Sequence, residues 1–278
     1  MRRLLSIEFI KLWNSRSSRF LIIAYFVLLT FIALIAAIKF DIGPIEFHLA
    51  EQGIFNFPFI WHFNTYIAAV FKLFLAIVIV SMMANEYSNK TLKQNLIDGL
   101  SKKEFVMSKF LTVVMFSGIS TVFIFVVSLV LGLIYSDFTE VGIIFSQLGY
   151  LLAYFLKLTA FFSFCLFLGM LVKRSAFALG FLVLWNILEG IVYAFLKFKV
   201  FDNSTIADSI AQFFPLNAMS NLIKEPFTRL GAVKSVAAQI GEEFTKNYAV
   251  QWYDVLIVTV WIFVFVYGTL FILRKRDL

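Results

Sequence analysis

Three ionisable side chains lie within long apolar stretches of the sequence, where a charge is costly unless it has a partner or water. These are Lys72, Lys157 and Glu189. Counted from the end of its stretch that is expected on the outer side of the membrane, each is about 8 to 11 residues deep, which corresponds to about 12 to 16 Å along a helix. We therefore expect the three in one layer, where a lysine pairs with Glu189 or all three line a translocation pathway. A structural ion pair that holds the helices together is the alternative.

Residues with catalytic or metal-binding chemistry are few in the rest of the sequence. Two histidines, His48 and His62, and one cysteine, Cys165, do not make a convincing metal site. No nucleophile stands beside a base, and no G-x-x-x-x-G-K-[ST] loop is present to hold nucleotide phosphates. We therefore expect no catalytic residue, no metal site and no cofactor in this chain. Cys165 lies in an apolar run, where a small buried side chain is expected.

The composition shows which solvent the chain is built for. Of its 278 residues, 61% are hydrophobic and only 15% are charged, and the mean hydropathy is +0.90. A soluble domain is about half apolar and about a quarter charged, so a water-soluble fold is excluded. A single cysteine also excludes a disulfide-stapled secreted module. The composition predicts an all-α integral membrane protein.

Six apolar stretches are long enough to cross the hydrocarbon core of about 30 Å. Their apolar residues are continuous rather than alternating, so helices are expected instead of a β-barrel. The first stretch, about 19 residues long, exceeds the roughly 7 to 15 apolar residues of a signal peptide. The predicted spans are approximately 20–38, 63–84, 110–135, 145–172, 177–196 and 255–273.

The basic residues are distributed unevenly between the two sides of these spans. Fifteen fall in the N-terminal segment, the second and fourth connections and the C-terminal tail, whereas seven fall on the opposite side. Short cytoplasmic connections carry the excess of Lys and Arg. We therefore expect both termini in the cytoplasm, with the protein in the cell (cytoplasmic or inner) membrane. The net charge of +7 fixes orientation and gives no reason to expect binding to nucleic acid.

The segment before the first span is amphipathic. Its apolar residues recur at helical spacing, and its charged residues, Glu8 among them, lie off that face. A helix with Trp on its apolar face and basic residues elsewhere suits the headgroup layer. We expect a cytoplasmic interfacial helix within residues 1–18, with a basic flank that only fixes topology as the alternative. The apolar face consists of Leu5, Phe9, Leu12 and Trp13.

The connection between the second and third spans, residues 85–109, is too long for a simple turn. Leu92, Leu96 and Ile97 recur at helical spacing and predict a short helix that projects into the cytoplasm. A turn follows, and the next helix then leads into the third span. The residues expected in the turn or facing a partner are Thr91, Leu92, Asn95, Leu96, Asp98, Gly99 and Leu100.

The start of that next helix has its own sequence signal. Ser101 can cap it, and Glu104 stands three positions on as the partner in a capping box. Lys102 follows the cap directly, and Lys109 opens the third span. The short helix is therefore expected to be followed by a separate helix whose start is marked by a capping box.

The order of residues in this connection resembles the hallmark segment of ABC-2 type permeases, the membrane subunits of a class of ATP-binding-cassette exporters. The family pattern is an acidic residue, Thr-Leu, an apolar pair, a turn, Ser-Arg or Ser-Lys, and a lysine that opens the next span. Asn89-Lys90 depart from it, because many members have glycine before the threonine. The interfacial helix, six spans and long fifth connection also fit, so the resemblance covers essentially the whole chain. The matching residues are Glu86, Thr91-Leu92, Leu96-Ile97, Asp98-Gly99-Leu100, Ser101-Lys102 and Lys109.

The resemblance implies a single ABC-2 type transmembrane domain over residues 1–278, with a coupling helix that docks on a separate ATP-binding subunit. It implies a permease subunit of an exporter, paired with a second copy or a related permease and surrounded by membrane lipids. ATP and Mg²⁺ are expected on the partner. An ordinary basic loop is the alternative for residues 85–109. A secondary transporter or channel that uses the buried Lys and Glu charges is the alternative function.

The fifth connection, residues 197–254, is long and carries short amphipathic pieces. One ends before Pro215, a second covers residues 216–224, and a third covers residues 233–244. They are expected to lie on or dip into the outer leaflet, or to form a small extracellular cap. In the first connection, the aromatic residues Phe55, Phe57, Phe59 and Trp61 are expected in an interfacial belt.

Overall fold

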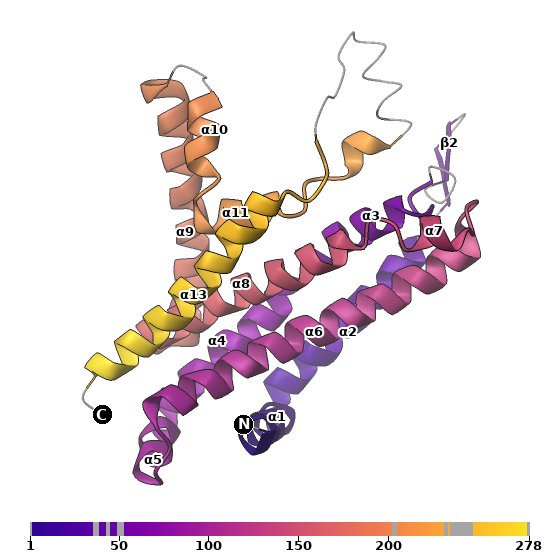
Figure 1. Cartoon of the computed structure of the whole chain (residues 1–278). Coiled ribbons are helices and arrows are strands. Elements are labelled where there is room, and N and C mark those ends of the chain that lie inside the picture. Colours follow the sequence, from indigo (N-terminus) through magenta and orange to yellow (C-terminus); the bar gives the residue numbers. More distant parts are fainter. Residues whose placement is uncertain are drawn as a thin grey trace.

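The computed structural model describes residues 2–35, 39–42, 45–48, 53–201, 205–230, 233 and 247–276. Most of these residues are helical, and the long helices lie side by side except for α9, which leans away from them (Figure 1). The elements are α1 (Arg2–Asn14), α2 (Arg16–Ile35), β1 (Lys39–Ile42), β2 (Ile45–His48), α3 (Phe59–Val70), α4 (Lys72–Ser88), α5 (Thr91–Ile97), α6 (Lys102–Tyr135), α7 (Val141–Ile144), α8 (Gly149–Val172), α9 (Ser175–Phe195), the π-helix η2 (Leu196–Val200), α10 (Thr205–Ala211), α11 (Pro215–Asn221), the 3-10 helix η3 (Phe227–Arg229) and α13 (Trp252–Lys275).

Several helices have the length and composition to cross a membrane. Among the described residues there are four such helices, and up to six if each of two bent helix pairs forms one span. One pair is α1 with α2, bent by 92°, and the other is α3 with α4, bent by 46° at Phe71. The 92° bend agrees with an α1 that lies across the start of α2. The helices therefore match a multi-pass membrane protein, and the predicted six spans correspond to the upper count.

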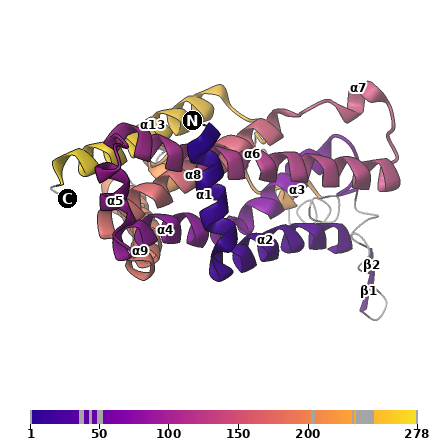
Figure 2. The ribbon, with the colours of Figure 1, turned by 90° about the horizontal axis from the view of Figure 1, so that it is seen from below.

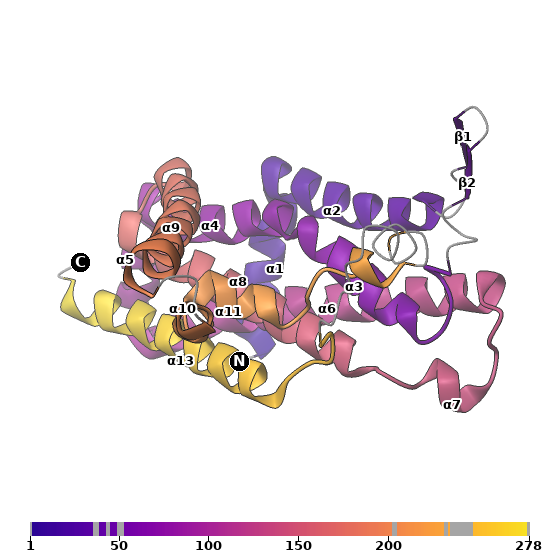
Figure 3. The same cartoon turned by 90° about the horizontal axis from the view of Figure 1, so that it is seen from above.

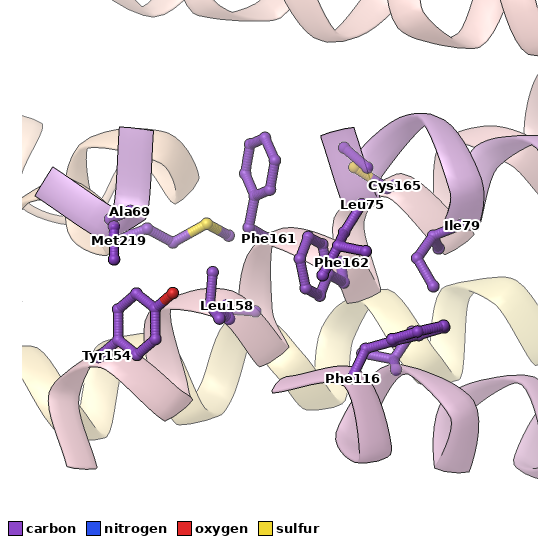
Figure 4. Packing of buried hydrophobic residues seen from close by; sticks show 14 of the residues in the cluster. Ala69, Leu75, Ile79, Phe116, Tyr154, Leu158, Phe161, Phe162, Cys165 and Met219 are labelled. Atoms are coloured by element: carbon purple, nitrogen blue, oxygen red, sulfur yellow. The ribbon is translucent and has the colours of Figure 1, made fainter. Parts of the chain in front are cut away.

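Helix α8 is the centre of the bundle. It lies between α4 and α13 in two views of the molecule (Figures 2 and 3). In the candidate span Val141–Val172, which contains α8, 72% of an 18-residue apolar stretch is buried, against 6% in the span that begins with α9. A helix that is apolar on all sides buries all of them. In Figure 4, Phe161 and Phe162 project from α8 toward different neighbours. Cys165 is a free, buried cysteine among them, as the sequence predicts.

The contact between α4 and α8 is close because α8 carries a glycine there. A Cβ atom added to Gly169 would lie 2.9 Å from the Cβ of Met83 and 3.4 Å from the carbonyl oxygen of Val80. The glycine thus lets the two backbones approach. Since α4 begins at Lys72 and carries Glu86 near its other end, this contact fixes the position of both charges relative to α8.

The first connection differs from the prediction in two respects. It contains a two-stranded antiparallel hairpin, β1–β2, so the fold is helical with one small strand pair. Three of its four aromatic residues, Phe55, Phe57 and Trp61, are buried instead of forming an interfacial belt, and Phe59 is half-buried. The indole of Trp61 donates to the carbonyl of Ile144 at 2.8 Å. Their packing against neighbouring helices removes them from the surface.

The fifth connection folds back on the bundle. Helix α10 is joined to η2, which continues α9, by an ion pair between the ammonium of Lys197 and the carboxylate of Asp208, 3.1 Å apart. Helix α11 starts with Pro215 at its first turn, where proline is favoured, and packs against α8, α9 and α13. Of the two predicted arrangements, this packing favours a segment that dips inward and argues against a separate extracellular cap. The third predicted piece, residues 233–244, lies outside the described residues apart from Val233.

The two ends of the bundle carry different elements. Helices α1 and α5 and both chain ends lie toward one end, which we call the α5 end, and α7 and the hairpin lie at the other, the α7 end (Figures 1 and 2). Contacts between Lys102 and the end of α13 agree with this placement. Both termini therefore lie toward the same end of the bundle, as an even number of crossings requires.

Candidate functional site

Four helices meet at the α5 end around one buried lysine. The Nζ atom of Lys109, which is 1% exposed, lies 2.6 Å from Glu8 Oε2 and 2.6 Å from Glu86 Oε1. Glu8 comes from α1, Glu86 from the last turn of α4 and Lys109 from the start of α6. Both carboxylates are themselves buried. An ammonium with two carboxylates at this distance forms charge-assisted hydrogen bonds, which are about twice as strong as neutral ones.

Two further side chains complete this group, which we call the ion cluster (Glu8, Lys11, Glu86, Thr91 and Lys109). Lys11 Nζ, at the cluster's solvent side, lies 3.0 Å from Glu86 Oε1. The hydroxyl of Thr91 donates to Glu86 Oε2 at 2.6 Å. Glu86 therefore accepts hydrogen bonds from three different elements, and Thr91 connects the first residue of α5 to the cluster.

The short helix α5 has a turn on each side. Lys90 adopts a left-handed conformation (φ 56°) that reverses the chain between α4 and α5. Gly99 ends the segment with φ +95°, a conformation that residues with a side chain rarely adopt. Ser101 Oγ then accepts from Glu104 N at 3.2 Å, and Glu104 Oε2 accepts from Ser101 N at 3.0 Å. This is the predicted capping box, and it starts α6.

The faces of α5 differ from the prediction. Leu92, expected to face a partner, is buried within the chain, and Asn95, Leu96 and Leu100 are half-buried. Leu92 follows Thr91, whose bond to Glu86 holds that side of α5 against α4. Ile97 is instead 70% exposed. Ile97 is thus the apolar side chain that α5 presents to its surroundings.

The residues that follow α5 are either exposed or held by hydrogen bonds to another part of the chain. Asp98, Gly99 and Ser101 are exposed. Lys102 is tied, because its ammonium donates to the carbonyl oxygens of Arg274 at 3.3 Å and Arg276 at 3.1 Å. The Lys102 side chain therefore fastens the C-terminal end of α13 beside the coupling segment.

The three charges within the apolar stretches do not meet as predicted. Lys72 and Lys157 line one cleft of about 420 Å³, but within the described chain neither forms an ion pair with Glu189. Both oxygens of Glu189 bind elsewhere, to Trp185 Nε1 at 2.7 Å and to the backbone N–H groups of Leu216 and Asn217 at 3.1 and 3.0 Å. Glu189 satisfies the start of α11, because α9 turns this residue toward that helix.

His62, a scarce residue type, has a packing role. Its Nε2 lies 2.8 Å from the carbonyl of Lys224 and its Nδ1 lies 3.0 Å from Arg229 Nη1. Both ring nitrogens are therefore occupied by protein. In the part of the chain that the structure describes, no group of three or more His, Cys, Asp or Glu side chains is placed to hold a metal ion.

The comparison with protein families decides the relationship. A family model described as ABC-2 family transporter protein matches residues 32–274, which is most of the chain. The chain belongs to the ABC-2 family. It is thus an ABC transporter permease, a multi-pass membrane subunit of a kind that is typically not itself catalytic, and the family implies an ATP-binding cassette partner in general. The comparison with curated proteins gave no significant match.

The motif residues of this ABC-2 permease converge in space. Glu86, Thr91 and Lys109 lie within 23 residues of one another in the sequence, and they supply two of the contacts in the ion cluster, Glu86–Thr91 and Glu86–Lys109. Glu8 and Lys11 were missed as members of the cluster, because the sequence pattern placed them off the apolar face of α1 and neither belongs to the family pattern between Glu86 and Lys109. A signal was present, since Glu8 is the first acidic residue of the sequence and stands among basic ones.

Proposed function

We propose that this ABC-2 permease is the membrane-spanning subunit of an ATP-driven exporter, and that its α5 end faces the cytoplasm and docks on a separate ATP-binding subunit. ATP and Mg²⁺ bind to that partner. Six spans cross the cell membrane, and two copies, or this chain with a related permease, form the transporter. The excess of Lys and Arg at the termini and in residues 85–109 supports this orientation.

The observation that carries the proposal is the ion cluster. It joins the first residue of α5 to α1, α4 and α6 through contacts of 2.6 to 3.0 Å. Breaking a buried ion pair by removing one partner costs about 3–5 kcal/mol. A push on α5 is therefore passed to three helices at once instead of being absorbed by a flexible loop. ATP-driven closure of the partner subunits then shifts the helix bundles as rigid bodies.

The surface offered to the partner is small and basic with an apolar centre. Ile97 is its exposed apolar residue, and Lys93 and Lys103 are exposed on either side of it in sequence. Apolar anchors surrounded by a polar rim are typical of protein interfaces. We therefore expect Ile97, rather than Leu92, to enter a pocket of the ATP-binding subunit.

The test compares two equally exposed apolar residues at opposite ends. Ile97 is 70% exposed at the α5 end, and Val141 is 69% exposed at the α7 end. The tagged chain is purified from its native membranes in mild detergent, and vanadate-sensitive phosphate release from ATP is measured in the eluate. We expect Ile97→Asp to lower this activity at least about tenfold, the loss of about 1.4 kcal/mol of binding, and Val141→Asp to leave it unchanged. Equal activity in all three proteins contradicts the proposal.

The alternative of an ion-coupled secondary transporter has no comparable support. It requires Lys72 or Lys157 to exchange a charge with Glu189, and the carboxylate of Glu189 is already bonded to Trp185 and to the start of α11. We therefore do not propose it.

A further inference from the structure

We propose that the cleft lined by α3, α4, α8, α9 and α11 is a binding site for an amphipathic anion, a molecule with one carboxylate or phosphate head group and an apolar chain. The proposal concerns binding alone. It goes beyond the exporter function and holds whether or not an ATPase docks at the α5 end.

The cleft contains two lysines and no acidic residue among the described residues that line it. Its volume is about 420 Å³, within the usual range of ligand sites. Its lining is otherwise apolar or uncharged. A lysine in an apolar stretch that has no carboxylate beside it needs another source of negative charge. The lining residues are Tyr66, Ala69, Val70, Lys72, Leu73, Lys157, Phe161, Leu182, Val183, Asn186, Leu216, Met219 and Ser220.

Lys157 has unused donors that a head group can satisfy. Its side chain is only 5% exposed, and its one hydrogen bond in the described chain is a long one, 3.4 Å to the carbonyl of Ile223. An ammonium carries three donors. Leaving a buried donor without a partner is costly, so an anion that reaches Lys157 recovers this free energy.

Lys72 supplies the second charge at the break between α3 and α4. Its Nζ lies 4.3 Å from the centroid of the Phe161 ring, a distance typical of a cation–π contact. It is also the first residue of α4, where the helix dipole adds a partial positive charge. In Figure 4 the side chain of Met219 extends toward Phe161, and both residues line the cleft.

The mouth of the cleft fits an apolar chain. Val70 and Leu73 from the broken helix and Val183 from α9 line it and are all exposed. In a membrane-spanning segment such residues contact acyl chains. A head group bound at Lys72 and Lys157 therefore has a lipid-facing exit for its tail, whereas a small hydrophilic anion gains nothing from these walls.

The carboxylate of Glu189 does not neutralise this site. It lines the neighbouring cleft, which shares Asn186, Leu216 and Ser220 with the first, and both of its oxygens accept hydrogen bonds from Trp185 or α11. Its carboxylate accepts hydrogen bonds from the first backbone N–H groups of α11. The two lysines thus remain the determinants of what the cleft binds.

The test is native mass spectrometry of the purified full-length protein with four probes. Palmitate and phosphatidylglycerol carry the proposed chemistry, hexadecanol has the same tail without charge, and inorganic phosphate has the charge without the tail. We expect palmitate or phosphatidylglycerol to bind at least about tenfold more tightly than hexadecanol and than inorganic phosphate. Preference for palmitate indicates a free amphiphile as the natural ligand, and preference for phosphatidylglycerol a bilayer lipid. Equal affinity for palmitate and hexadecanol overturns the proposal without the use of any variant.

Variants then place the site. Lys72→Gln and Lys157→Gln are each expected to weaken binding of the preferred anion about tenfold or more, and Lys157→Arg, which keeps the charge, to weaken it less. Lys197→Gln is the matched control, because Lys197 pairs with Asp208 outside the cleft. Unchanged affinity in both cleft variants, or an equal loss in Lys197→Gln, overturns the assignment. If a variant does not fold, the affinities of the unaltered protein for palmitate and hexadecanol still show whether the site requires an anionic head group.

Discussion

Two buried lysines of this permease have opposite surroundings. Lys109 lies 2.6 Å from each of two carboxylates, whereas Lys157 has a single long hydrogen bond to a carbonyl oxygen. A lysine whose charge is met by the protein holds helices in place. A lysine that has no carboxylate partner in the protein lowers stability and can bind an external anion. The same residue type therefore serves structure at the α5 end and binding in the cleft.

The largest effect is expected at Lys109. Lys109→Met leaves the carboxylates of Glu8 and Glu86 buried side by side, and removing one partner of a buried ion pair costs about 3–5 kcal/mol. We expect a loss of this size in the free energy of unfolding, measured by denaturation in mixed micelles. The control is the triple variant Glu8→Gln, Glu86→Gln, Lys109→Met, which removes all three charges and is expected to recover most of the loss. A stable Lys109→Met protein breaks the comparison.

The next effect concerns the helix contact that links the two regions. Gly169→Leu forces a side chain between α8 and Met83 of α4, and overpacking costs about 1–3 kcal/mol. Because α4 carries Lys72 and Glu86, both the cleft and the ion cluster are expected to be disturbed. Gly180, which has no atom within 4 Å of an added Cβ, provides the control. Equal unfolding free energies for Gly169→Leu and Gly180→Leu contradict this packing.

A smaller effect separates charge from local helix capping. Ser101→Ala removes the cap of α6 beside the ion cluster without removing a charge, and loss of such a cap costs about 1 kcal/mol. We expect faster hydrogen exchange at the amides of residues 101–105, with the contacts of Lys109 retained. Exchange that accelerates throughout α6 to the same extent argues against a local role for the cap.

The smallest effect is expected to have the opposite sign. Lys157→Met replaces an incompletely bonded ammonium with an apolar side chain of similar length, which removes the cost of burying a charge that has no carboxylate partner. We expect the free energy of unfolding to stay within about 1 kcal/mol of the original protein or to rise. A loss as large as that of Lys109→Met erases the distinction between the two lysines. The same unfolding measurement serves both variants.

The sequence was sufficient for the long apolar helices, although not for the break between α3 and α4, and for the local signals within residues 85–109. Continuous apolar runs identified the long helices, and the capping box and Gly99 marked the limits of α5 and α6, because these features depend on neighbouring residues only. The sequence could not show which side of α5 faces inward. That side is fixed by the bond from Thr91 to Glu86, a contact between two successive helices that the helical spacing within α5 does not predict.

The candidate site was predicted only in part, because contacts between helices also decide which of its residues meet. Depth along each span placed Lys72, Lys157 and Glu189 in one layer, but depth says nothing about the direction in which a helix turns its residues. Glu189 faces the start of α11, so it meets backbone N–H groups instead of a lysine. Glu8 was missed because a buried carboxylate on an amphipathic helix becomes visible only when its partner, Lys109, is placed beside it.

The docking of an ATP-binding subunit at α5 is tested most directly by site-specific photo-cross-linking in the native membrane. A benzophenone side chain is introduced at Ile97 and, as the control, at Val141, which is equally exposed at the other end of the bundle. The proposed function predicts a cross-link from position 97 to a polypeptide that contains a G-x-x-x-x-G-K-[ST] loop, and none from position 141. No such cross-link from position 97, or equal cross-linking from both positions, contradicts it.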